Sequence, residues 1–133
     1  MIYYIKVIAS YLRTLGVRPM AELTRARAHA ILAAHKVIDG SDPEALETFM
    51  VDATQLGLGE EGFEWMRWPA YRQRQVEQPA FIAVADLETL RRVTTTHVRL
   101  ERFVSGHLLR MQEVGVPTAI VDRLRALLEA NAI

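Results

Sequence analysis

The sequence predicts an all-α protein, a compact bundle of six or seven helices with short connections. Apolar residues recur at spacings of three and four, as on one face of a helix, and no stretch alternates with the period of two that a strand would show. Proline and glycine stand where these periodic segments begin and end. The length of 133 residues predicts a single domain, residues 1–133, and the glycine-rich loop at residues 57–62 is the candidate subdomain joint.

The first two predicted helices cover residues 2–15 and a segment that begins at Pro19 and stops at Gly40. Proline suits the first turn of a helix, and glycine suits its end. The apolar start, MIYYIKVIASYL, is too short to cross a bilayer and has neither a basic leading segment nor a cleavage site. We therefore expect a core helix there, and neither a membrane span nor a secretion signal.

The third predicted helix begins with a capping residue, Asp42, followed by Pro43 at the first helical position, and it ends near Gly57. After the glycine-rich loop, proline again marks the start of each element. A short helix is predicted over residues 69–77, and one more helical turn begins at Pro79.

A long helix is predicted over residues 87–114, capped by Asp86 and closed by the turn VGVP. The last helix opens at Pro117, and four apolar residues form its buried stripe: Ile120, Leu124, Leu127 and Leu128. The long helix contains Ser105-Gly106, and a glycine inside a helix usually marks a bend or a close neighbour. The aromatic residues Trp65 and Trp68 are expected to pack in the core near it.

Two adjacent rows of residues spaced by seven form the buried face of the long helix: Leu90, His97, Val104 and Met111, and Val93, Leu100, His107 and Val114. Both histidines therefore lie on the buried face, where a histidine is most often a hydrogen-bonded core residue. Ten residues of continuous helix would separate them by about 15 Å. They are thus not expected to share a metal ion, and no metal site is predicted.

A polar strip runs along another face of the same helix: Arg92, Thr95, Arg99 and Arg102. These four residues are the candidate binding site, because arginine makes planar, two-pronged contacts with anions. Glu101 follows His97 by four residues, and that spacing allows a pair that would orient the imidazole ring. A solvated face crossed by ordinary ion pairs is the alternative interpretation of the strip.

Composition excludes several classes of function. Cysteine is absent, so disulfides, thiolate zinc sites and cysteine nucleophiles are excluded, and a cytoplasmic location fits. Sixteen basic and sixteen acidic residues balance, which makes nucleic-acid binding unlikely as a role. Eight of the acids lie in residues 39–64, which contain no base. This segment either neutralises basic parts of the same fold or gives the molecule faces of opposite sign.

A series of motifs occurs in one order along the second half of the chain: Trp65 and Trp68, the threonines Thr94 to Thr96, Arg99, the pair Arg102-Phe103, and the pair Gly106-His107. Over residues 63–128 this series resembles an uncharacterised bacterial family, domain of unknown function 6508. Members often carry cysteine and an acid after the Arg-Phe pair, where this chain has Val104 and Ser105. The resemblance implies a bacterial origin and a shared helical unit, and it implies no known activity.

Together, these observations favour a small helical binding module. Its arginine strip would hold an acidic protein surface or a small anion, and a phage- or plasmid-borne inhibitor is one version of such a module. The alternative is a small enzyme acting on an anionic substrate, with His97, His107 and Glu101 as its acid/base residues. No recognisable nucleophile, nucleotide-binding motif or metal-binding motif supports that alternative, and no cofactor is expected.

Overall fold

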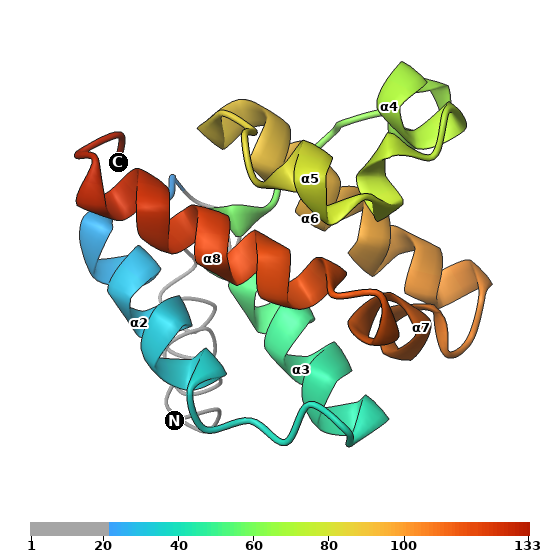
Figure 1. Cartoon of the computed structure of the whole chain (residues 1–133), viewed down its shortest axis with the longest axis horizontal. Helices are drawn as coiled ribbons and strands as arrows, with labels where there is room; N and C mark the ends of the chain where they lie inside the picture. The colour runs from blue at the N-terminus through green and yellow to red at the C-terminus, as the bar shows by residue number, and fades with distance from the viewer. Residues whose placement is uncertain (1–21) are drawn as a thin grey trace.

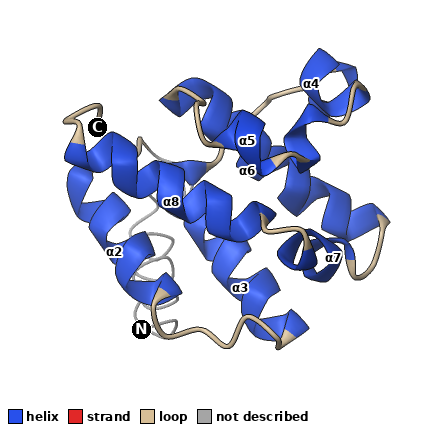
Figure 2. Ribbon diagram, in the orientation of Figure 1, coloured by secondary structure: helices blue, strands red, loops and turns tan. Residues whose placement is uncertain are grey.

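Helices make up most of the described chain. The computed structural model describes residues 22–133, and within that range it contains seven α-helices, three short helical segments of other types and no strand (Figure 1, Figure 2). The all-α prediction is confirmed. The helix predicted over residues 2–15 lies outside the described residues. None of the helices in residues 22–133 has the length and apolar character needed to cross a membrane.

Helix α2 (Arg25–His35) and helix α3 (Pro43–Ala53) begin as their side-chain caps dictate. The Arg27 amide donates to the hydroxyl of Thr24, which caps α2, at 3.2 Å. The prediction of one helix from Pro19 to Gly40 was too long. Residues 22–24 are not helical, and α2 ends at His35, before the turn at Gly40. At α3 the cap was predicted correctly: the Glu44 amide donates to Asp42 at 3.0 Å.

Short segments connect α3 to the second half of the bundle. The π-helical turn η1 (Thr54–Leu58) ends α3, and Gly57 there has a φ of 114°, which favours glycine. Four brief elements follow: η2 (Trp65–Arg67), α4 (Pro69–Arg72), η3 (Gln75–Glu77) and α5 (Pro79–Ile82). The single helix predicted over residues 69–77 is wrong, because the backbone at Arg74 is left-handed, with a φ of 61°.

The long helix predicted over residues 87–114 is two helices at a sharp turn. Helix α6 (Leu87–Phe103) ends before Gly106, and the short helix α7 (His107–Glu113) follows it. Because the helix ends early, two residues predicted to be buried are exposed: Val104 is 41% and Val114 is 52% accessible. Helix α8 (Val116–Glu129) has Gly115 as its N-cap, and its predicted stripe is buried.

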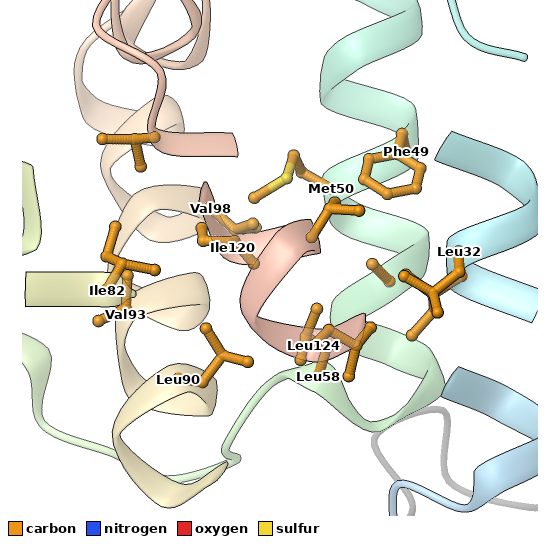
Figure 3. Close-up of a cluster of buried hydrophobic side chains, with 14 of the residues drawn as sticks. Leu32, Phe49, Met50, Leu58, Ile82, Leu90, Val93, Val98, Ile120 and Leu124 are labelled. Atoms are coloured by element: carbon orange, nitrogen blue, oxygen red, sulfur yellow. The ribbon is translucent and has the colours of Figure 1, made fainter. Parts of the chain in front are cut away.

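Helix α8 lies across the middle of the bundle and contacts α2, α5, α6 and α7 (Figure 1). Apolar side chains from several helices meet there (Figure 3). These include Leu32 of α2, Phe49 and Met50 of α3, Leu90 and Val93 of α6, and Ile120 and Leu124 of α8. The core is therefore continuous between the two halves of the sequence.

The two tryptophans differ in burial. Trp65 is buried and meets Tyr71 edge-on, with ring centroids 4.9 Å apart. Trp68 is only half-buried, and it meets Phe63 edge-on at 5.3 Å. Trp65 is thus the tryptophan whose removal would leave the more enclosed cavity.

We expect Trp65→Ala to lower the free energy of unfolding by about 3–5 kcal/mol, because it empties a closed aromatic site. Urea denaturation followed by circular dichroism measures this change. Met66→Ala is the matched control, because the neighbouring Met66 is 55% exposed and its loss should cost about 0.5 kcal/mol or less. Equal effects of the two changes would show that Trp65 is not part of the packed interior.

Candidate functional site

Three consecutive threonines of α6 are buried: Thr94, Thr95 and Thr96. Each hydroxyl donates to the backbone carbonyl four residues earlier, at 2.8 to 2.9 Å. The hydroxyl oxygen of Thr95 also accepts the amide of Glu60 at 2.9 Å. Thr95 therefore does not lie on an exposed strip as predicted, because it faces the loop that follows η1 and holds it.

The predicted arginine strip divides into a paired end and an unpaired end. Arg92 is held by Glu60 at 3.0 Å and by Glu88 at 2.7 Å. Arg99 and Arg102, about two and three turns further along α6, form no ion pair within residues 22–133. Of the four predicted binding residues, only Arg99 and Arg102 retain guanidinium groups without a partner there.

Arg91 has a structural role that the sequence did not suggest. Its guanidinium donates to the carbonyls of Gly57 and Gly59, at 2.7 to 3.0 Å, and fixes the glycine-rich loop on α6. Both acceptors are backbone atoms, so no complementary acidic residue in the sequence could have indicated the contact.

A carboxylate stabilises the turn between α6 and α7. Glu101 accepts the amides of Gly106 and Leu108, both at 2.9 Å. These amides belong to the start of α7, where donors lack partners within the helix. Gly106 adopts a φ of 83° with open space around it, so the position requires glycine for its backbone conformation and not for a close neighbour. The predicted pair of His97 with Glu101 is not formed, since Glu101 caps α7.

The turn brings the two histidines together. Nδ1 of His97 lies 2.9 Å from Nε2 of His107, and the two rings are nearly parallel, with centroids 5.2 Å apart. Nε2 of His97 lies 2.7 Å from the carbonyl oxygen of Val76. The predicted separation along one helix was wrong, because α6 ends at Phe103 and the chain turns before α7 begins at His107.

These contacts determine which nitrogens carry protons. The Val76 carbonyl can only accept, so Nε2 of His97 carries a proton and donates to it. Burial is the main cause that lowers the pKa of His97 to about 4, so the ring is neutral at neutral pH and Nδ1 is an acceptor. Nε2–H of His107 therefore donates to Nδ1 of His97, which leaves Nδ1 of His107 as a free acceptor.

The surroundings of His107 also favour its neutral form. Burial is the largest cause that lowers its pKa, and the positive charge of Arg110 lowers it further. The carboxylates of Glu101 and Glu77 act in the opposite direction and are weaker. At neutral pH His107 is thus a hydrogen-bond acceptor through Nδ1 and not a cation.

The spacing of the two rings fits a hydrogen bond better than a shared metal ion. Two nitrogens bound to one tetrahedral zinc at the usual bond lengths lie about 3.3 Å apart, which exceeds the observed 2.9 Å. Across residues 22–133, no group of three histidine or acidic side chains could hold a metal ion. We therefore assign no metal to this pair.

A cavity of about 420 Å³ opens beside His107. Its walls come from α4, η3, α6 and the start of α7: Tyr71, Arg72, Arg74, Val76, Glu77, Leu100 and His107. A much smaller recess, about 40 Å³, lies between α3, η1 and α6 near Arg99 and Arg102. The candidate site thus has two parts, an open cavity at the histidine pair and an arginine surface at the end of α6.

These features define a small helical protein in which a buried histidine pair borders an open cavity. The chain belongs to the family of unknown function DUF6508, whose model matches residues 27–130. The match therefore covers most of the chain, beyond the resemblance over residues 63–128. No curated protein and no solved structure matches this chain.

We expect the free energy of unfolding to fall by up to about 3 kcal/mol as the pH is lowered from 6.5, the ordinary pKa of histidine, to about 4, the pKa of buried His97. In that interval the unfolded chain binds a proton that the folded chain excludes, so stability is full above the interval and is lost as the pH falls through it. Urea denaturation at several pH values measures the slope.

His97→Gln should flatten this dependence, because glutamine can donate to the Val76 carbonyl but does not titrate. His29→Gln is the control, since His29 is exposed on α2. If the free energy of unfolding of the His97 variant depended on pH as in the unchanged protein, His97 would not be the residue that is protonated only in the unfolded chain.

Proposed function

We propose that this protein is a bacterial, cytoplasmic binding module that uses the end of α6 to bind an acidic surface of a partner protein. The supporting observation is the absence of any ion pair to Arg99 or Arg102 within the described chain. Several arginines elsewhere on this fold do pair with a carboxylate, as Arg67 does with Glu64 and Arg125 with Asp122. Two adjacent cations without such neighbours favour an anionic partner.

Apolar residues beside the two arginines support the same proposal. Phe103 is 68% exposed and Val104 is 41% exposed, directly after Arg102. The Phe103 ring lies 6.1 Å from that of Trp65, centroid to centroid, so one of its sides is supported by the fold. Arginine and aromatic residues are the types that dominate binding energy at protein interfaces.

The shape of this surface favours a protein over a small anion. The recess at Arg99 and Arg102 has a volume of about 40 Å³. Sites for small organic ligands are several times larger, roughly 300 Å³ or more. A surface with two cations, an exposed ring and only this small recess is better matched by a partner protein than by a ligand that must be enclosed.

The alternative, an enzyme with His97, His107 and Glu101 as acid/base residues, has weaker support. His97 is fully buried and cannot touch a substrate. Both carboxylate oxygens of Glu101 accept amides of the α6–α7 turn. Only His107 borders a cavity, so the three residues do not face a common substrate.

We expect the double change Arg99→Ala and Arg102→Ala to leave the melting temperature nearly unchanged, because neither arginine supports the fold. Affinity for the partner should fall by about 2 kcal/mol or more, as for arginines at the centre of an interface. The partner is first captured from a bacterial lysate and identified by mass spectrometry, and binding is then measured by calorimetry. Affinity of the unchanged protein should also decrease as salt is added.

The charge-matched control is Lys36→Ala with Arg125→Ala, which removes one cation from the C-cap of α2 and one from α8, away from the end of α6. It should bind as the unchanged protein does. Equal loss in both double variants would indicate a general effect of net charge, and unfolding of the Arg99 and Arg102 variant would make those arginines structural.

A further inference from the structure

The cavity beside His107 is separate from the arginine surface and has its own chemistry. Its volume of about 420 Å³ lies within the range of small-molecule sites. Val76 and Leu100 give it an apolar wall, and polar groups stand on the other sides. An organic ligand with a hydrophobic body and a few polar groups matches such walls.

His107 supplies one fixed polar contact. The histidine is almost wholly buried, at 5% exposure, yet it lines this cavity. Its Nε2–H is committed to His97, and within residues 22–133 nothing donates to its Nδ1. Because the ring is held neutral in one tautomer, Nδ1 selects a ligand group that donates a hydrogen bond, such as a hydroxyl.

The cavity also has one cation without a partner. Arg74 is paired with Glu77 at 2.7 Å, so these two charges compensate each other. Arg72 has no ion pair in the described chain, and it is exposed at the cavity wall. The remaining charge is positive and favours a carboxylate, which can accept two hydrogen bonds from a guanidinium group.

We propose that this cavity binds a small hydroxylated organic acid, whose carboxylate pairs with Arg72 and whose hydroxyl donates to Nδ1 of His107. The apolar body of the ligand packs on Val76 and Leu100. The proposal does not depend on the partner-binding surface, because Arg99 and Arg102 do not line this cavity.

The test is calorimetric titration of the full chain with para-hydroxybenzoate and meta-hydroxybenzoate, which differ in the separation of carboxylate and hydroxyl. Benzoate lacks the donor, and para-hydroxybenzyl alcohol lacks the anion. We expect one hydroxybenzoate isomer to bind at least tenfold more tightly than both of these compounds, because each contact adds roughly a factor of ten. Proton–nitrogen NMR of the histidine rings should show that Nδ1 of His107 shifts on binding.

Arg72→Gln should weaken the binding of the hydroxybenzoate at least tenfold, whereas Arg102→Gln, which removes an exposed cation that does not line the cavity, should not. Neither change affects a buried residue, so both variants should fold. Absence of saturable binding at millimolar concentrations overturns the proposal. So does binding of benzoate as tight as that of both hydroxybenzoates, or an unchanged affinity in the Arg72 variant.

Discussion

The carboxylate of Glu101 controls the arrangement of the second half of the fold. It accepts two amides at the start of α7 and so stabilises the turn that the positive φ of Gly106 makes sterically accessible. If α6 continued straight, His107 would lie about 15 Å from His97 along the axis. The turn instead places the two rings in hydrogen-bond contact and His107 at the cavity wall.

The buried threonines of α6 satisfy the polar groups that this helix brings into the interior. Their hydroxyls donate to carbonyls of their own helix, so they need no polar partner from another element. The ring nitrogens of His97 are instead in hydrogen-bond contact with residues outside α6, the carbonyl of Val76 and the ring of His107. Within this group of threonines and histidines, each hydroxyl and three of the four ring nitrogens have a hydrogen-bond partner, and the remaining nitrogen, Nδ1 of His107, lies on a residue that borders the cavity.

Local signals were sufficient to predict most of the helices but not the site. Asp42 and Asp86 were identified as caps because a cap depends on residues within one turn. The contact between His97 and His107 depends on the turn between α6 and α7, and the sequence did not reveal this turn because the apolar period continues through Ser105-Gly106. Arg91 was missed because its acceptors are backbone carbonyls, and Thr95 was misplaced because the loop that covers it lies 35 residues away.

The two ends of α6 carry similar side chains with different physical roles. Near the start, Arg91 donates to a carbonyl of the glycine-rich loop and Arg92 pairs with a carboxylate, so both side chains stabilise the fold. Near the end, Glu101 accepts two amides at the start of α7, and Arg99 and Arg102 form no ion pair within residues 22–133. The start of α6 therefore supports the fold, whereas its end carries both the carboxylate that holds the turn to α7 and two cations that can meet an anionic surface.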